Sequence, residues 1–148
     1  MNAKQPIEAA ETVPSVLNNA LLDQYRARKS NLLSRLITAY LQEAPNFIQN
    51  IRKAEASMNF DELRANSHAL KSCSYNLGAM RLSKACQELE GAAGARDTAL
   101  VQAVLARFGP ECFEAEQALR SELYKQNRST MDAQLAATNT EVAIQDWN

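Results

Sequence analysis

The chain has 148 residues, of which 46% are hydrophobic, and it contains only four glycines and four prolines. This length suits one domain with a full apolar core, and the scarcity of turn-forming residues favours a mostly helical protein. The formal net charge of −1 excludes the strongly basic surface that non-specific nucleic-acid binding requires, so no nucleic-acid partner is expected.

No apolar run reaches the ~18 residues that a membrane-spanning helix needs, and the N-terminus lacks the apolar segment of a signal peptide. We therefore expect a cytoplasmic protein with no membrane segment. The three cysteines, Cys73, Cys86 and Cys112, are widely spaced and form no Cys-x-x-Cys pair. This pattern indicates small buried residues rather than a disulfide or a metal site.

Residues 1–14 are polar, contain two prolines and show no hydrophobic periodicity, which predicts a flexible leader. A short amphipathic helix should follow, with Ser15 as its N-cap and apolar residues as far as Tyr25. A long helix is then expected from about Ser30 to Ser57. Pro45 lies inside it and predicts a kink near residues 41–44, but the apolar pattern continues in phase, which indicates one bent helix.

A third helix should begin at Asn59, a suitable N-cap, and Glu62 three residues later completes the pattern of a capping box. Gly78 should end this helix, because glycine enters the left-handed conformation at little cost. A tight reversal would let the following helix, closed by Gly91 and Gly94, pack back against it.

The last helix of the core should begin at Asp97 or Thr98, and Pro110 predicts a bend or a break around residues 106–109. Its apolar positions end near Leu123, so the folded domain should cover residues 15–124. Residues 125–148 are mostly polar and predict a disordered tail, with Trp147 as its one large apolar side chain. The expected fold class is all-α: an antiparallel four-helix bundle with a short additional N-terminal helix.

The single histidine, His68, lies in the middle of the third predicted helix. Apolar and small residues recur along this helix with the period of one buried face, at positions 60, 63, 67, 70, 74 and 77. At ~100° per residue, His68 lies roughly 140° from the middle of this stripe, so its ring should face solvent. Arg64, Lys71 and Tyr75 share its face. An exposed imidazole beside a lysine on a rigid helix is typical of a reactive site.

The segment His68-Ala69-Leu70-Lys71-Ser72, followed by Leu77-Gly78-Ala79, resembles the motif of the histidine-containing phosphotransfer (HPt) domain family. The likeness covers residues 16–124 and continues through Leu82, Ala85, Cys86 and Leu89-Glu90 of the next helix. Cys73 and Tyr75 stand where small residues are usual in the family. Neither replaces a residue that contacts the phosphoryl group.

The resemblance implies a phosphocarrier of a two-component phosphorelay, without kinase or phosphatase activity of its own. His68 would accept a phosphoryl group from the aspartate of a response-regulator receiver domain, such as that of a hybrid sensor histidine kinase, and pass it to another receiver. Lys71 would offset the phosphoryl charge, and the small Ser72 would leave room for the receiver. Arg64 and Tyr75 are candidates for a docking face.

The same resemblance implies that this chain holds no cofactor and no metal, since Mg²⁺ belongs to the receiver domain. A monomer is expected.

Other interpretations stay open on the sequence alone. His68 could be an ordinary surface histidine, Lys71 a solubilising lysine and Gly78 only a helix terminator. The alternative function is a helical-bundle adaptor that binds a partner through its exposed face without phosphoryl chemistry. An enzyme is disfavoured, because the sequence has no glycine-rich phosphate-binding loop and the lone histidine has no second acid–base partner. Labelling by a phosphorylated receiver domain would distinguish a phosphocarrier from an adaptor.

Overall fold

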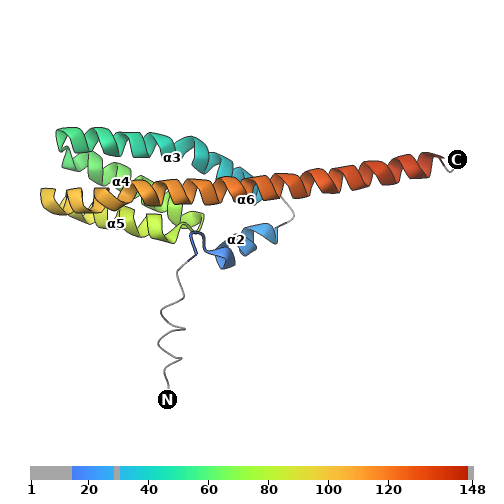
Figure 1. Ribbon diagram of the computed structural model, residues 1–148, viewed down its shortest axis with the longest axis horizontal. Coiled ribbons are helices and arrows are strands. Elements are labelled where there is room, and N and C mark those ends of the chain that lie inside the picture. The colour runs from blue at the N-terminus through green and yellow to red at the C-terminus, as the bar shows by residue number, and fades with distance from the viewer. Residues whose placement is uncertain (1–14, 29–30, 147–148) are drawn as a thin grey trace, which may run out of the picture.

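The structure, a computed structural model, describes residues 15–28 and 31–146, with side chains as far as Asn139, and this part of the chain is helical without a strand. The helices are α2 (Asn19–Arg26), α3 (Leu32–Ser57), α4 (Phe60–Asn76), α5 (Met80–Gly94) and α6 (Thr98–Asp146). Helices α3, α4, α5 and the first half of α6 form an antiparallel bundle, and α2 lies across one end (Figure 1). The predicted fold class is confirmed. The predicted leader and Trp147 lie outside the described residues.

The bundle encloses a single apolar core to which every helix contributes. Most of the predicted stripe of α4 is buried: Leu63, Ser67, Leu70, Ser74 and, just after the helix, Leu77. Phe60 is only half-buried, and Asn66, which the predicted stripe does not include, is buried as well. None of the described helices combines the length and the hydropathy that a membrane span requires. The largest side chains that are fully buried include Phe108, Leu22, Ile37, Ile51, Leu63, Leu70, Leu82, Leu89 and Leu119.

The reversal between α4 and α5 depends on Gly78, which has the left-handed φ of 74° that the sequence predicts. Two hydrogen bonds close the end of α4: the N–H of Gly78 donates to the carbonyl of Tyr75 at 2.9 Å, and the N–H of Ala79 donates to the carbonyl of Ser74 at 2.9 Å. This is the Schellman pattern of helix termination. The carbonyl of Gly78 also accepts from the N–H of Asn18 at 2.8 Å, which ties the start of α2 to this turn.

Helix α2 begins later than the sequence predicts, and Ser15 is not its cap. The N-cap is Asn18, whose side chain accepts from the N–H of Leu21 at 3.3 Å, while the Ser15 hydroxyl donates to the carbonyl of Leu17. The reason is that Leu17 is buried in the core ahead of the helix, so the chain turns into α2 only after it.

Asn59 caps α4 as predicted, because its side chain accepts from the N–H of Glu62 at 3.2 Å. The reciprocal half of a capping box is absent. The N–H of Asn59 instead donates to the carbonyl of Ala54 and closes α3, whose C-cap Met58 is left-handed. With that donor occupied, the Glu62 carboxylate accepts from Asn66.

The end of α5 also differs from the prediction. Gly91 lies inside the helix and Gly94 is its last residue, whereas the left-handed residue that follows is Arg96, with φ 54°. Asp97 then caps α6, since its side chain accepts from the N–H of Leu100 at 3.0 Å.

Neither internal proline breaks its helix. Pro45 lies inside the continuous α3, as expected, and Pro110 lies inside the continuous α6, where a break was one of the two predicted outcomes. Phe108 and Cys112 are buried on either side of Pro110. Because both pack against the bundle, α6 continues although Pro110 has no backbone N–H to donate a hydrogen bond.

The last part of the chain differs most from the expectation. The sequence predicts a disordered tail from residue 125, whereas α6 continues through Asp146 and projects beyond the bundle (Figure 1). Residues 125–146 contain no glycine and no proline, and they are rich in alanine and glutamine, which favour helix. Because α6 is already nucleated in the bundle, each further residue needs only propagation.

Replacing Gly78 by valine should lower the free energy of unfolding by about 1–3 kcal/mol, because a side chain is strained at this φ. A Cβ here would also lie 2.9 Å from the backbone nitrogen of Asn18. Urea unfolding followed by circular dichroism measures the loss.

Gly91→Ala is the matched control, because a Cβ at Gly91 meets nothing within 4 Å. Since alanine is a better helix former than glycine, this variant should be as stable as the wild type or up to about 1 kcal/mol more stable. If the two variants unfold alike, the account of the turn is wrong.

Candidate functional site

His68 lies on the outer face of α4, opposite the buried stripe, and 61% of its side chain is exposed. Asn59 and Gly78 set the two ends of α4 and therefore the angular position of every residue between them. The imidazole is presented on a rigid helix rather than on a loop, as the periodicity predicts.

The imidazole is held by a residue of the neighbouring helix α5. Its Nδ1 lies 2.9 Å from Oε1 of Glu90, and the other carboxylate oxygen, Oε2, accepts from Nζ of Lys71 at 2.7 Å. One carboxylate thus joins the histidine and the lysine across the α4–α5 interface. Its side chain is 20% exposed, so this pairing is shielded from solvent more than the imidazole itself.

This contact determines which ring nitrogen is free to react. A carboxylate only accepts hydrogen bonds, so Nδ1 of His68 must carry the proton that Glu90 receives. In the neutral imidazole, Nε2 then keeps its lone pair, and it is the nitrogen that can act as a nucleophile.

Lys71 does not point freely into solvent as the sequence suggests. Its side chain is 28% exposed and forms the ion pair with Glu90. The hydrogen bond from Lys71 is the largest influence on this carboxyl group and, despite partial burial, holds the pKa of Glu90 below its ordinary value. The hydrogen bond from His68 acts in the same direction. Glu90 is therefore a stable anion at neutral pH.

Ser72 is exposed one turn after His68, and its hydroxyl donates to the carbonyl of His68 at 3.2 Å. The side chain is folded back on its own helix and leaves the space beside the imidazole open. Gly78 lies far from the imidazole and acts only through the turn.

Of the two candidate docking residues, Arg64 lies next to the imidazole and Tyr75 lies two turns along α4. Arg64, Asp61, Ala65, His68 and Glu90 line one shallow hollow at the α4–α5 surface. Tyr75 is 58% exposed on the same side of α4.

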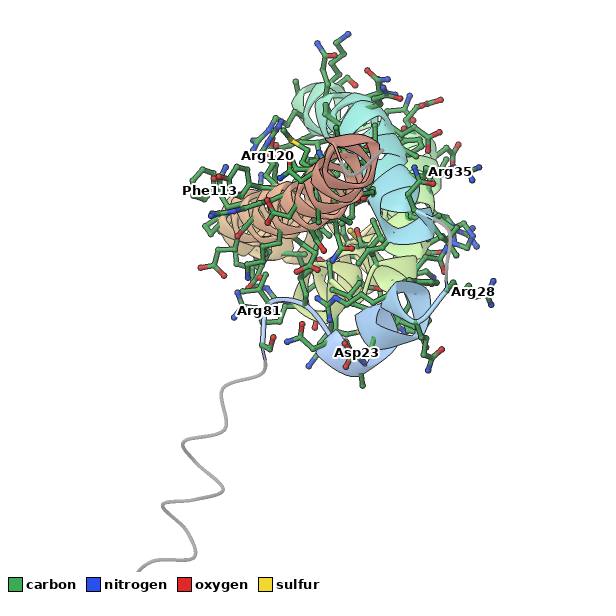
Figure 2. The ribbon with its side chains drawn as sticks, turned by 90° about the vertical axis from the view of Figure 1, so that its right-hand side faces the viewer. Asp23, Arg28, Arg35, Arg81, Phe113 and Arg120 are labelled. Carbon is green, nitrogen blue, oxygen red and sulfur yellow. The ribbon has the colours of Figure 1, made fainter. Side chains whose placement is uncertain are left out.

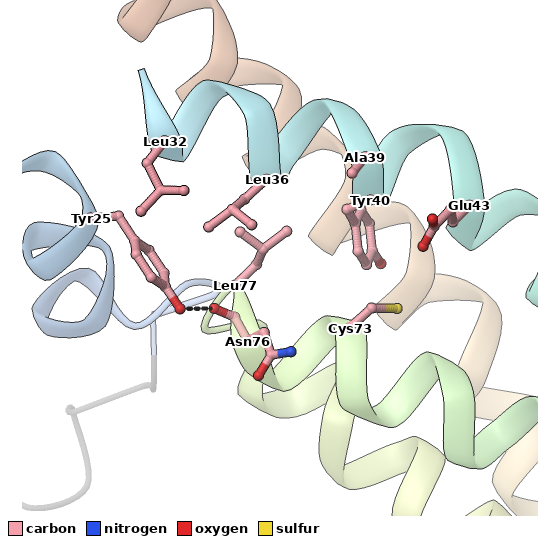
Figure 3. A pocket seen from close by; sticks show the side chains of 9 residues that line it. All are labelled: Tyr25, Leu32, Leu36, Ala39, Tyr40, Glu43, Cys73, Asn76 and Leu77. Carbon is pink, nitrogen blue, oxygen red and sulfur yellow. Dashed lines mark hydrogen bonds between the residues drawn. The ribbon is translucent and has the colours of Figure 1, made fainter. Parts of the chain in front are cut away.

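A second hollow of about 410 Å³ lies between α2, α3 and α4, where the hydroxyl of Tyr25 donates to the carbonyl of Asn76 at 2.8 Å (Figure 3). Its walls are mostly apolar, and Cys73 is the one thiol in them. Burial raises the pKa of Cys73 to about 11, so the thiol is protonated and unreactive at neutral pH. All three cysteines are unpaired and at least half-buried, which agrees with their predicted role in packing.

Glu90 is the functional residue that the sequence prediction lacks. In the sequence, Glu90 stands out only as part of the family likeness, because a glutamate on the second helix of a hairpin is usually a solvated charge. The signal was its place near the end of α5: Gly78 reverses the chain ten residues after His68, and Glu90 follows twelve residues later. No group of three or more His, Cys, Asp or Glu side chains that could hold a metal ion occurs among the described residues.

Comparison with known proteins identifies the family of the chain. Residues 35–146 match the family model of the Hpt domain, and the chain belongs to this family. Its function is histidine phosphotransfer in a phosphorelay, in which Hpt domains exchange phosphoryl groups with receiver domains.

The fold is that of the histidine-containing phosphotransfer protein B (HptB) from Pseudomonas aeruginosa PAO1, with a TM-score of 0.71 and 18% identity. The match covers 76% of this chain and 98% of that one. A search of curated proteins finds no match.

Lys71→Ala should raise the pKa of Glu90, since it removes the strongest influence that lowers it. Carboxyl carbon shifts of Glu90, followed by NMR during a pH titration, measure this change. Lys84→Ala is the control, because Lys84 is an exposed lysine of the same helix as Glu90. If Glu90 titrates alike in all three proteins, the ion pair does not form in solution.

The same shift has a consequence for stability. The pKa of Glu90 is lower in the folded chain than in the unfolded chain. The ionised carboxylate therefore contributes fully to folding stability above the unfolded pKa, and this contribution is lost as the pH falls through the folded pKa. Glu90→Gln should therefore cost more stability at pH 7 than in acid.

Proposed function

We propose that His68 is the phosphoryl acceptor of this Hpt domain and that the group is carried on Nε2. The observation that supports this most is the 2.9 Å contact between Nδ1 and Glu90, which leaves Nε2 as the nucleophilic nitrogen on an exposed ring. A histidine held by a carboxylate in this way has its tautomer and orientation defined before the phosphoryl donor arrives.

In the forward step the Nε2 lone pair attacks the phosphorus of a phosphoaspartate on a receiver domain. The bond between phosphorus and the aspartyl oxygen breaks, and the receiver regains its carboxylate. The imidazole becomes positively charged as the N–P bond forms, and the anionic Glu90 stabilises that charge through Nδ1–H. The reverse sequence passes the group to the aspartate of a second receiver.

Lys71 supplies positive charge beside the phosphoryl group. Before transfer, the ammonium group of Lys71 donates a hydrogen bond to Glu90. The oxygens of the arriving phosphoryl group then compete with Glu90 for this ammonium group. Ser72 keeps the approach to the imidazole open, and Arg64 and Tyr75 contribute to the surface on which the receiver docks. Mg²⁺ would be bound by the receiver, and this chain would need no cofactor.

We further propose that the protein is a carrier without kinase or phosphatase activity. Phosphoryl transfer is mostly positioning and charge stabilisation, and this chain contributes a nucleophile, a cation paired with Glu90 and an orienting carboxylate. A receiver domain of a hybrid sensor histidine kinase is a suitable donor.

His68→Gln should abolish labelling by a phosphorylated receiver domain while leaving the fold intact, because glutamine keeps the polarity but has no nucleophilic ring nitrogen. Surface substitutions usually change stability by less than about 0.5 kcal/mol, so a circular dichroism melt should match the wild type. The wild-type label should be lost in acid and kept in alkali, as a phosphoramidate is.

Ser72→Ala is the control for a serine ester one turn away, and this variant should label normally. A His68→Gln protein that still takes up phosphate would place the acceptor elsewhere. If no variant and no wild-type protein is labelled by any receiver, the adaptor alternative is favoured.

Glu90→Ala should slow phosphoryl transfer at least about tenfold, because the imidazole loses its orientation and its fixed tautomer. Rapid-quench transfer assays measure the rate, and ¹⁵N shifts of the His68 ring should report a mixture of tautomers. Glu88→Ala is the matched control, since Glu88 pairs with Arg107 of α6 and not with the imidazole. Equal rates for the two variants would mean that Glu90 has no positioning role.

A further inference from the structure

The part of α6 beyond the bundle exposes large apolar side chains along one side. Tyr124, Met131 and Leu135 are 66%, 60% and 57% exposed. Their spacing of seven and four residues places them within about 40° of one another around the helix axis. They form a stripe, which we call the α6 stripe, on a helix of which residues 127–139 are exposed throughout.

The α6 stripe faces away from the bundle. Leu119 and Glu122, which are buried against the other helices, lie on the opposite side of α6. Phe113 and Arg120 lie on the stripe side, and they point outward from α6 when the molecule is viewed along this helix (Figure 2). Among the described residues no helix packs on this side of the stripe. An exposed apolar stripe on a helix is stabilised by a partner that covers it.

Apart from Glu122, which is buried and paired with Arg26, the charges along this part of α6 are separated by sign. Arg120, Lys125 and Arg128 precede Met131, whereas Asp132, Glu141 and Asp146 follow it. A parallel pair of such helices would place like charges together. An antiparallel pair would place the basic half of each helix beside the acidic half of the other.

We propose that two copies of this chain associate through the α6 stripe as an antiparallel helix pair, with a two-fold axis close to residue 130. In this register Met131 packs on its own copy and Tyr124 packs on Leu135 of the second copy. The register also places Arg128 beside Asp132 of the second copy.

Opposite charges also meet at the ends of the helix pair. Arg120, which also pairs with its own Glu116 at 2.9 Å, lies beside position 141, a glutamate, of the second copy. Each contact occurs twice because a two-fold interface is self-complementary. The α6 stripe contains no residue of α4, so His68 stays accessible in the pair. The monomer expected from the sequence is replaced in this proposal by a dimer.

Sedimentation equilibrium of the full chain should give twice the chain mass of 16.4 kDa. Met131→Asp combined with Leu135→Asp should produce a monomer that still accepts phosphate from a receiver domain at the wild-type rate. A wild-type chain that stays monomeric at about 100 μM would overturn the proposal. A dimer that survives the double substitution would overturn it as well, since the interface would lie elsewhere.

The antiparallel register has its own test. Glu141→Lys places a lysine beside Arg120 of the second copy twice and should weaken dimerisation about tenfold, and adding Arg120→Glu should restore it. Positions 120 and 141 are 21 residues apart, so no contact within one helix can produce this rescue. If Glu141→Lys has no effect, or if the second change fails to restore the dimer, the antiparallel pair is wrong.

Sedimentation with anionic lipid vesicles distinguishes a different use of the stripe. Because the α6 stripe is covered in the dimer, the wild-type chain should stay in solution. Binding of a monomeric wild-type chain to the vesicles, lost in the double aspartate variant, would assign the stripe to a lipid surface and overturn self-association.

Discussion

The left-handed turn at Gly78 is the constraint on which the rest of the site depends. It reverses the chain within a few residues, so α4 and α5 run antiparallel in close contact. The same backbone accepts a hydrogen bond from Asn18 and leaves no space for a side chain there. One glycine therefore sets the position of α5 and of α2 relative to α4.

This turn connects the chemistry on two helices. Burial of the apolar side of α4 leaves His68 exposed, but exposure alone does not make a histidine reactive. The reversal brings Glu90 beside it, and the carboxylate binds the imidazole with one oxygen and Lys71 with the other. The arrangement presents a fixed tautomer, an open Nε2 and a nearby cation on two packed helices.

Much of the fold could be predicted because helical periodicity depends only on which side of a helix is buried. The stripe of α4, the exposure of His68, the cap at Asn59 and the left-handed Gly78 all follow from local sequence. The contact between Glu90 and His68 joins two helices, and its geometry depends on how they are packed. The hydrophobic pattern of a single helix does not report a distance between side chains of two helices.

The mistakes have a common cause as well. Residue type favours Ser15 and Glu62 as capping residues. The burial of Leu17 moves the cap of α2 to Asn18, and the N–H of Asn59 donates to the carbonyl of Ala54 rather than to Glu62. Local propensity predicts a bend or a break at Pro110 and disorder after residue 125. In the structure, α6 is instead supported by packing at Phe108 and extended by propagation from an existing helix.

The central claim is that the phosphoryl group is carried on Nε2 of His68 while Nδ1 remains bound to Glu90. The chain has one histidine, so labelling with ¹⁵N-histidine reports on a single ring. After phosphorylation by a receiver domain, NMR should show coupling of phosphorus to Nε2 and a proton retained on Nδ1. Coupling to Nδ1, or a phosphorylated protein in which neither nitrogen is coupled to phosphorus, would contradict the account.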